Sequence, residues 1–266
     1  MIPYPNINPT IVCLGPFSIK WYGLAYVVSF AIGYIYIYIL AKKNKIPLLI
    51  KDVDTLFLYS IIGVVGGGRI GYILIYNFNY YISHPLHMLF IWEGGMSFHG
   101  GLIGFIIMGL IFCSYKKINA YNIADRIVLI IPIGLFLGRI ANFINGELCG
   151  RATNLPWGMV FPQAGPTLRH PSQLYEAFFE GIVIFLILDL SRNKLLNIKG
   201  ALFWLFIILY GFFRFMIEFT RKPDPQMGFV VAFFTVGQIL SALMFVIGVV
   251  AIISVWRKNV RRNHQL

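Results

Sequence analysis

The chain alternates between long apolar runs and short polar connections. Seven runs cover residues 19–40, 55–76, 97–115, 122–143, 174–191, 200–220 and 229–256. A helix of about 20 apolar residues crosses a hydrocarbon layer of roughly 30 Å. Strands of a membrane barrel are shorter and alternate in polarity, whereas these runs are continuously apolar. The pattern therefore predicts an all-α, polytopic integral membrane protein with seven transmembrane helices.

Composition agrees with this interpretation. Of 266 residues, 58% are hydrophobic and only 12% are charged, and the mean hydropathy is +0.76. Soluble domains carry about 25% charged residues. These values exclude a water-soluble globule and a disordered chain. No internal repeat or linker divides the sequence, so we expect a single membrane-embedded domain over residues 1–266, with an outer loop segment at about 146–173.

The basic residues predict how the helices are oriented. Fourteen of the 22 Lys and Arg residues fall in one set of alternate connections: Lys42, Lys43, Lys45, Lys51, Lys116, Lys117, Arg126, Arg192, Lys194, Lys199, Arg257, Lys258, Arg261 and Arg262. By the positive-inside rule this side is cytoplasmic, which puts the N-terminus outside and the C-terminus inside. No Lys or Arg precedes Lys20, so we expect the first helix to be retained rather than cleaved as a signal peptide. Because the net charge of +12 is scattered between apolar runs, it predicts no nucleic-acid partner.

Three arginines lie inside predicted spans, namely Arg69, Arg139 and Arg214. Each would cost about 2.5 to 3.5 kcal/mol at the centre of a helix. With the predicted orientation, all three lie toward the outer leaflet. One explanation is structural: the side chains snorkel to the interface or pair with Glu180 or Glu218. The other explanation is a binding site for an anion.

Further polar residues fall at the same predicted depth: Tyr22, Tyr26, His99, Tyr175 and Glu176. Helical spacing also places Asn142 and Phe143 on the face of Arg139, and Tyr210 and Glu218 on the face of Arg214. The guanidinium fork fits phosphate, so the pattern favours the head group of an anionic phospholipid as ligand. A structural Arg–Glu network that holds helices together is the alternative.

Glycines surround one histidine. The run from Glu93 to Gly101 has the sequence EGGMSFHGG and places His99 at a predicted helix boundary beside flexible backbone. Most single histidines are structural, but the titration range of imidazole also suits a general base. His99 is therefore a candidate for proton transfer.

Five motifs, in order along the chain, resemble those of bacterial prolipoprotein diacylglyceryl transferases. The strongest match is GRIANFINGELCG at residues 138–150. The others are WYG at 21–23, SFHGG at 97–101, HPSQLYE at 170–176 and YGFFR at 210–214. The chain is thus similar to this family over almost its whole length.

The resemblance implies an enzyme that moves the diacylglyceryl group of phosphatidylglycerol to the lipobox cysteine thiol of a preprolipoprotein. The reaction forms a thioether and releases glycerol phosphate, as the first step of lipoprotein maturation. The family is an integral membrane protein of the bacterial inner membrane, with its site toward the periplasmic or outer face. The functional residues of the family fall here on Tyr22, His99, Arg139, Asn142, Glu147, Gly150, Tyr210, Arg214 and Glu218. Arg69 is an additional candidate for lipid binding, from its predicted depth alone.

The chemistry explains these residue types. A thiol with a pKa of about 8.5 must become a thiolate, and a phosphate ester must leave with negative charge. As a hypothesis, His99 takes the proton, and Arg139 and Arg214 grip the phosphate as its bond to carbon breaks. Carboxylates would orient the arginines, and the remaining polar groups would fix lipid oxygens. Glu147 and Glu218 are expected to orient the arginines. Asn142 and Tyr210 are expected to form hydrogen bonds with glycerol or phosphate oxygens, and Gly150 to permit a tight backbone turn.

The three cysteines, Cys13, Cys113 and Cys149, are widely spaced. They form no Cys-x-x-Cys motif and no zinc-like arrangement, so we predict no disulfide framework, no metal and no cofactor. The nucleophile belongs to the substrate, and Cys149 is interpreted as a small, half-buried residue.

Other functional classes fit less well. A transporter of anionic solutes also places arginines among glycine-broken helices, but such folds often show inverted repeats, and none is visible. An intramembrane protease would need a partnered serine or an aspartate pair, but Asp125 and Asp189 lie near predicted cytoplasmic ends. A scaffold does not explain the common depth of the polar residues. The segment 146–173, with Arg151, Trp157 and Arg169, is the expected docking surface for the signal peptide.

Overall fold

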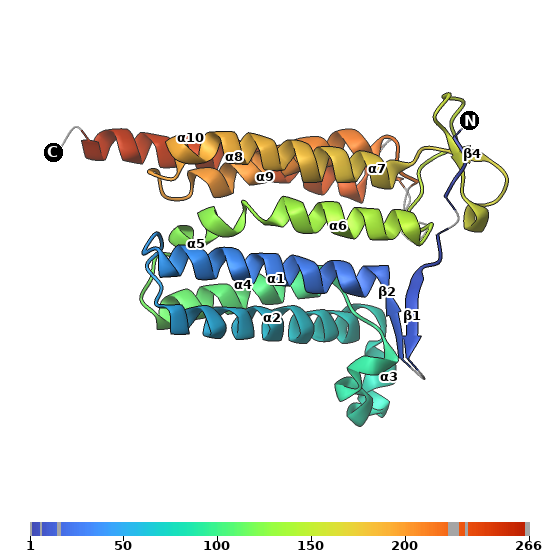
Figure 1. Cartoon of the computed structure of the whole chain (residues 1–266), viewed down its shortest axis with the longest axis horizontal. Helices are drawn as coiled ribbons and strands as arrows, with labels where there is room; N and C mark the ends of the chain where they lie inside the picture. The colour runs from blue at the N-terminus through green and yellow to red at the C-terminus, as the bar shows by residue number, and fades with distance from the viewer. Residues whose placement is uncertain (1, 6, 15–16, 223–228, 232–233, 264–266) are drawn as a thin grey trace. The chain divides into compact units, whose positions relative to one another are not determined.

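The computed structural model describes the chain except residues 1, 6, 15–16, 223–228, 232–233 and 264–266. Helices dominate the described part (Figure 1). They are α1 (Trp21–Lys42), α2 (Ile50–Tyr76), α3 (Phe78–Ser83), α4 (Phe98–Tyr115), α5 (Ala120–Ile127), α6 (Ile131–Ile144), α7 (Ser172–Glu176), α8 (Ile184–Leu195), α9 (Ala201–Glu218) and α10 (Val236–Asn263). Shorter helical turns are the 3₁₀ segments η1 (Pro85–Leu89), η2 (Ile91–Glu93) and η3 (Pro162–Ala164), and the π-helical segment η4 (Ala177–Val183).

Three small antiparallel hairpins complete the described structure. They pair β1 (Thr10–Leu14) with β2 (Phe17–Lys20), β3 (Met159–Val160) with β4 (Leu168–Arg169), and β5 (Phe229–Val231) with β6 (Phe234–Thr235). Each sheet has only two strands. Such hairpins are too small to form a core of their own, so helix packing has to stabilise the fold.

Five described helices are long and apolar enough to cross a membrane: α1, α2, α4, α9 and α10. Helices α5 and α6 form a sixth candidate span that is bent by 43°. The prediction of a polytopic helical membrane protein is therefore confirmed. The predicted span 174–191 falls within α7, η4 and α8, which follow one another without a break from Ser172 to Leu195. The count of seven spans stays a prediction.

Two predicted helices differ from the structure. The run 122–143 is not one straight helix, because Pro132 lies in the first turn of α6. Proline lacks the N–H for an interior hydrogen bond and disfavours helical geometry at the preceding residue. The run 229–256 does not begin as a helix, because its first residues form the hairpin β5–β6. Helix α10 begins after Thr235, whose Oγ1 accepts a hydrogen bond from the backbone N–H of Gln238 (3.2 Å).

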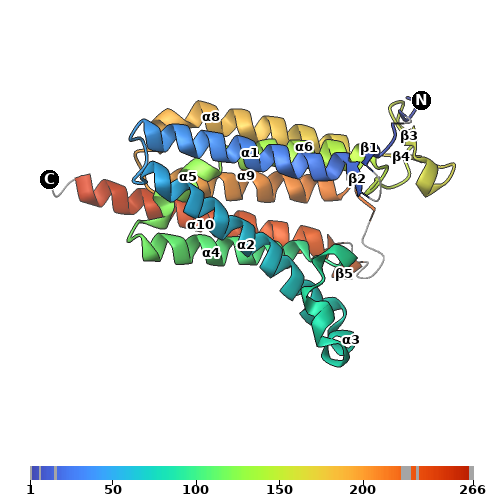
Figure 2. The ribbon, with the colours of Figure 1, turned by 60° about the horizontal axis from the view of Figure 1, so that its bottom comes forward.

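The described chain forms two compact units. Unit 1 contains Met1–Gly33 and Ala124–Leu266, and unit 2 contains Tyr34–Ile123. In unit 2, helices α2 and α4 lie side by side (Figure 2). Their backbones touch at glycines: a Cβ on Gly71 would lie only 2.8 Å from the Cα of Gly100. Backbone contact of this kind requires small residues on both helices.

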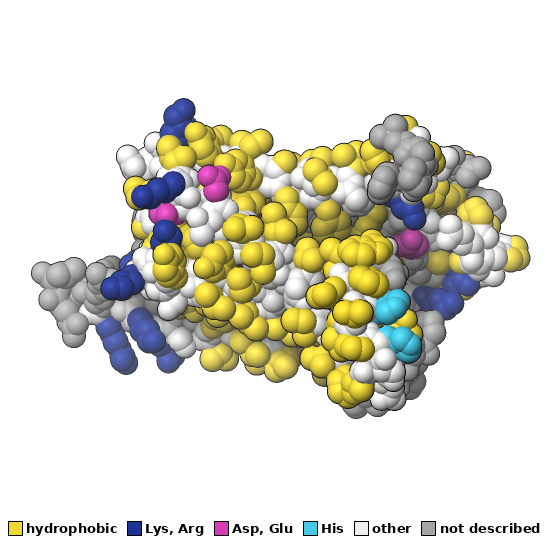
Figure 3. All heavy atoms as spheres, turned by 90° about the horizontal axis from the view of Figure 1, so that it is seen from below, with side chains coloured by type: hydrophobic (Ala, Val, Ile, Leu, Met, Phe, Trp, Pro, Cys, Tyr) yellow, Lys and Arg dark blue, Asp and Glu magenta, His cyan; other side chains and the backbone are white. Residues whose placement is uncertain are grey.

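In unit 1, helices α9 and α10 pack together, and α6 packs on η4. Glycines again permit the contact: a Cβ on Gly181 of η4 would lie 2.7 Å from the Cβ of Phe136 in α6. Hydrophobic side chains cover much of the face shown in Figure 3. Val27, Ile75 and Leu190, for example, are 66%, 68% and 80% exposed. In water such surfaces would be unfavourable, so they fit contact with lipid.

Candidate active site

Unit 1 encloses a cluster of six charged side chains, which we call the Arg–Glu cluster. Its members come from α6, α7, η4, α9 and the segment after α9: Arg139, Glu176, Glu180, Arg214, Glu218 and Arg221. The glutamate side chains are at most 7% exposed, and those of the arginines are 16 to 18% exposed. The carboxylates thus lie deepest, and the guanidinium groups are the more accessible part of the cluster.

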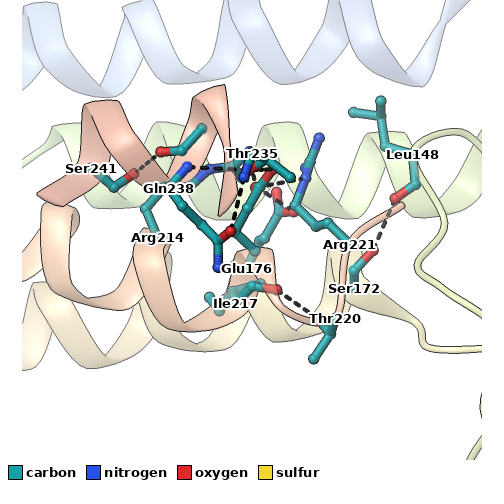
Figure 4. Close-up of polar contacts among 12 residues, drawn as sticks. Leu148, Ser172, Glu176, Arg214, Ile217, Thr220, Arg221, Thr235, Gln238 and Ser241 are labelled. Carbon is teal, nitrogen blue, oxygen red and sulfur yellow. Dashed lines mark hydrogen bonds and ion pairs between the residues drawn. The ribbon is translucent and has the colours of Figure 1, made fainter. Parts of the chain in front are cut away.

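Glu176 is the centre of the cluster. Its Oε2 lies 2.5 Å from Nε of Arg139. Its Oε1 lies 2.5 Å from Nη1 of Arg221 and 3.4 Å from Nη1 of Arg214. Figure 4 shows Glu176 between Arg214 and Arg221. One buried carboxylate therefore draws three cations from different elements to one place.

Glu180 lies one helical turn beyond Glu176, in the π-helical segment η4. Its side chain is fully buried, with one oxygen 3.7 Å from Nη2 of Arg139 and the other 3.7 Å from Nη1 of Arg214. Within the described part of the chain, neither oxygen accepts a hydrogen bond. Such π-helical segments are frequent at functional sites. Glu180 thus balances charge near both arginines without occupying their hydrogen-bond donors.

Glu218 closes the cluster at the end of α9. Its Oε2 lies 2.9 Å from Nη2 of Arg214 and 3.3 Å from Nε of Arg221. The hydroxyl of Thr235 donates to its Oε1 (3.0 Å). A Cβ on Gly237 would lie 2.9 Å from the same oxygen. The start of α10 therefore holds this carboxylate in place.

Three predicted site residues, Arg139, Arg214 and Glu218, meet in the Arg–Glu cluster. Tyr210 lies one turn before Arg214 on α9. Asn142 lies one turn after Arg139 and is 7% exposed. These five residues come from two helices of the same unit, and their spacing alone had placed them on common faces.

Two other predicted residues of unit 1, Glu147 and Tyr22, are exposed and take no part in the ion pairs of the Arg–Glu cluster. The carboxylate of Glu147 is exposed, and its Oε1 accepts a hydrogen bond from Nδ2 of Asn145 (3.3 Å). Among the described residues Glu147 forms no ion pair, and the arginines are oriented by Glu176, Glu180 and Glu218 instead. Tyr22, at the start of α1, is 40% exposed.

Gly150 lies where the segment 146–173 meets the residues that follow α9. Its N–H donates to the carbonyl of His170 (2.9 Å), and it pairs with Arg221 in a β-bridge. A Cβ at this position would lie 2.7 Å from the Cβ of His170. Gly150 therefore permits a close approach of three segments, and this contact places the backbone of Arg221. The pKa of His170 is lowered because burial disfavours the charged imidazolium.

His99 and Arg69 belong to unit 2. His99 lies in the first turn of α4, and its side chain is exposed. Arg69 is only 4% exposed, and its guanidinium donates to backbone carbonyls of the segment between α3 and α4.

No site role was predicted from the sequence for Glu176, Glu180 or Arg221. Glu176 was noted for its predicted depth and as the last residue of the HPSQLYE motif, Glu180 was considered as a structural partner of the arginines, and Arg221 was not considered for the site. Two spacings in the sequence could have indicated these residues. Glu176 and Glu180 are four residues apart, and Glu218 and Arg221 are three apart, so each pair falls on one face of a helix.

The described residues contain no group of three or more His, Cys, Asp or Glu side chains arranged to hold a metal ion. The three cysteines are free thiols: Cys13 exposed, Cys113 buried and Cys149 intermediate. The side chains of the Arg–Glu cluster and its neighbour Thr235 present guanidinium groups, carboxylates and a hydroxyl.

Comparison with known proteins decides the family. A sequence model described as prolipoprotein diacylglyceryl transferase matches residues 9–254. The chain belongs to this family. A relative from Desulfotalea psychrophila is 49% identical over 249 residues, which is 92% of each chain. Relatives from Rickettsia canadensis and Geobacter sulfurreducens are 47% and 46% identical and cover 92% and 97% of this chain and 95% and 98% of their own.

All three relatives carry the name phosphatidylglycerol–prolipoprotein diacylglyceryl transferase. The resemblance drawn from the five motifs is therefore confirmed. The match to the family extends over both compact units.

Proposed function

We propose that this chain transfers the diacylglyceryl group of phosphatidylglycerol to the cysteine thiol of a prolipoprotein. The product is a thioether, and glycerol phosphate leaves. Family membership at 46 to 49% identity over at least 92% of the chain carries this proposal. We also propose that residues 1–266 act as one membrane-embedded catalytic domain.

The Arg–Glu cluster supports a phosphate grip by Arg139 and Arg214. Both guanidinium groups are held by carboxylates behind them and are more exposed than those carboxylates. A planar guanidinium binds phosphate through two parallel hydrogen bonds. As the carbon–oxygen bond breaks, negative charge grows on the phosphate, so fixed cations stabilise the transition state more than the bound lipid. Glu218 keeps Arg214 aimed, and Glu176 keeps Arg139 aimed.

His99 is proposed as the general base. The substrate thiol must lose its proton before sulfur attacks the glycerol carbon, and a neutral imidazole accepts that proton directly or through water. The side chain of His99 is exposed, which fits contact with an incoming peptide. Sulfur then forms the new bond to carbon, while the phosphate oxygen keeps the electron pair of the bond that breaks.

The other predicted site residues are proposed to hold the lipid head group. Tyr22, Asn142 and Tyr210 offer hydroxyl and amide groups for glycerol or phosphate oxygens. Gly150 shapes the outer segment, and Glu147 lies at its exposed start.

The proposal includes a location in the bacterial inner membrane, with seven spans, an external N-terminus and a cytoplasmic C-terminus. The charge distribution supports this orientation. The site then faces the periplasmic or outer leaflet. The outer segment 146–173, with Trp157 and Arg169, is proposed to dock the signal peptide that carries the lipobox.

The test is a transfer assay with the purified full chain in detergent, phosphatidylglycerol and a lipobox peptide. We expect the peptide mass to increase by one diacylglyceryl group, and a peptide with serine in place of the cysteine to stay unmodified. A transporter needs two compartments, whereas transfer does not, so an adduct in detergent separates the two functions. Absence of the adduct with folded protein would contradict the proposal.

A further inference from the structure

Arg69 is a buried cation whose hydrogen-bonding capacity is fully used within unit 2. A guanidinium has five N–H donors. Those of Arg69 reach five backbone carbonyls: Nε reaches Met88 (3.0 Å), Nη1 reaches Gly94 (2.5 Å) and Gly95 (3.2 Å), and Nη2 reaches His87 (2.6 Å) and Phe90 (3.0 Å). The ring of Tyr81 lies 5.1 Å from its Cζ. No donor of this guanidinium remains for a phosphate oxygen.

The five carbonyls belong to one irregular segment, residues 87–95, which contains most of η1 and all of η2. Carbonyl groups at the ends of such short turns need partners from outside the turn. Arg69 donates to five carbonyls of this segment from a single position on α2, and one of them, that of His87, also accepts from the N–H of Phe90 (3.2 Å). A lysine has three donors and no planar fork, so it cannot reproduce this set.

The next residues of the chain are anchored to the same turn of α2. The N–H of Ser97 donates to the carbonyl of Gly68 (2.9 Å), next to Arg69. The Oγ of Ser97 accepts from the N–H of Gly100 and so caps α4 (3.2 Å). A Cβ on Gly100 would lie 2.9 Å from the Cα of Gly71. His99 thus lies in a first helical turn that α2 fixes on both sides.

We propose that Arg69 is a positioning residue: by holding segment 87–95 on α2, it fixes the start of α4 and thereby the imidazole of His99. This inference rests on the proposed role of His99. It replaces lipid binding as the function of Arg69, because the donors of the guanidinium are all directed at backbone carbonyls. The anchoring contacts and His99 lie in the same unit, so the effect needs no distant coupling.

Kinetic constants test the proposal. We expect Arg69→Lys to lower kcat about 10-fold and Arg69→Met about 100-fold, because a displacement of roughly 1 Å costs rates of this order. The KM for phosphatidylglycerol should stay within about twofold, since uniform lipid binding is untouched. Arg192→Lys, at an exposed arginine paired with Asp189, is the matched control and should leave both constants unchanged. A raised KM with unchanged kcat in Arg69→Lys would instead assign lipid binding to Arg69.

A double-mutant cycle separates positioning from general loss of structure. If Arg69 acts through His99, adding Arg69→Lys to His99→Gln should cost less than about twofold beyond His99→Gln alone. Effects that multiply would overturn the proposal. Size-exclusion profiles of each variant establish that it is folded, and Arg69→Lys keeps the cycle usable if Arg69→Met does not fold.

Hydrogen exchange of the lipid-free protein tests the anchor without any activity. We expect the amides of residues 87–100 to exchange about tenfold faster in Arg69→Lys, but not in Arg139→Lys. Unchanged exchange in Arg69→Lys would refute the anchor even if transfer is normal. If the wild-type protein makes no adduct, or if His99→Gln is fully active, the proposed function or the base role fails instead, and the exchange result alone then decides whether Arg69 is an anchor.

Discussion

Two buried arginine sites, one in each unit, use the same side chain in opposite ways. In unit 1, Arg214 meets three carboxylates, at 2.9 to 3.7 Å. In unit 2, Arg69 meets five backbone carbonyls and an aromatic ring. Carboxylates orient a cation while leaving it partly accessible, whereas five carbonyls occupy it fully. A buried arginine in a membrane helix is therefore not by itself evidence of an anion site. Its hydrogen-bond and ion-pair partners determine whether it can still bind an anion.

The largest effect is expected at the Arg–Glu cluster. Arg139→Ala and Arg214→Ala should each lower transfer at least about 100-fold, because a preorganised donor to the developing charge is lost. Lysine should rescue poorly, since it cannot form the fork. The adduct assay measures both, with Arg192→Ala as control. Normal turnover in either alanine variant, at wild-type membrane levels, would remove the phosphate grip.

The carboxylate at the centre of the cluster should matter for stability as well. Glu176→Gln keeps the shape but leaves three arginines without their common partner, and breaking a buried pair costs about 3 to 5 kcal/mol. Thermal unfolding in detergent measures this loss. Asp189→Asn removes an exposed carboxylate (37%) that lies 2.9 Å from Arg192, and it should change the free energy of unfolding by less than about 0.5 kcal/mol. Equal shifts in the two variants would contradict the buried cluster.

A smaller effect is expected at Gly150. The added methyl of Gly150→Ala must displace His170 or Thr220, which costs about 1 to 3 kcal/mol. Gly109→Ala is the control, because a Cβ there meets no atom within 4 Å. In thermal unfolding, Gly150→Ala should therefore unfold at a lower temperature than Gly109→Ala. If Gly150→Ala is as stable as Gly109→Ala, the close approach at Gly150 is not required.

The smallest effect is expected at Cys149. It lies inside the strongest family motif, but the reacting thiol belongs to the substrate, so Cys149→Ser should keep transfer within about twofold. The adduct assay measures this directly. Loss of nearly all transfer in a folded Cys149→Ser protein would instead assign this thiol a role in the reaction.

The class of fold could be predicted from the sequence because it depends on hydrophobicity and charge averaged over whole segments. Such averages change little when a single residue departs from the pattern. They did not predict the bend before α6 or the hairpin β5–β6, because these depend on single residues such as Pro132 and Thr235. Spacing along one helix placed Tyr210, Arg214 and Glu218 together. The same spacing offers Arg221, three residues after Glu218. It could not bring in Glu176, which lies 45 residues from its partner Arg221 in the chain.

The predicted depth of a residue in the membrane was the least informative guide to its role. Arg69 and Arg139 were predicted at similar depth, yet their partners differ completely. What separates them is the path of segment 87–95, whose carbonyls reach Arg69. Irregular backbone of this kind has no hydrophobic period, so its course is set by hydrogen bonds that only the folded chain displays.

The central claim is that Arg139 and Arg214 hold the phosphate of the lipid. The most direct test is an experimental structure of the protein with bound phosphatidylglycerol. We predict phosphate oxygens about 2.8 Å from the guanidinium nitrogens of both arginines, with Arg69 still bound to its five carbonyls. A phosphate that contacts neither arginine, or one that has drawn Arg69 away from segment 87–95, would contradict the account.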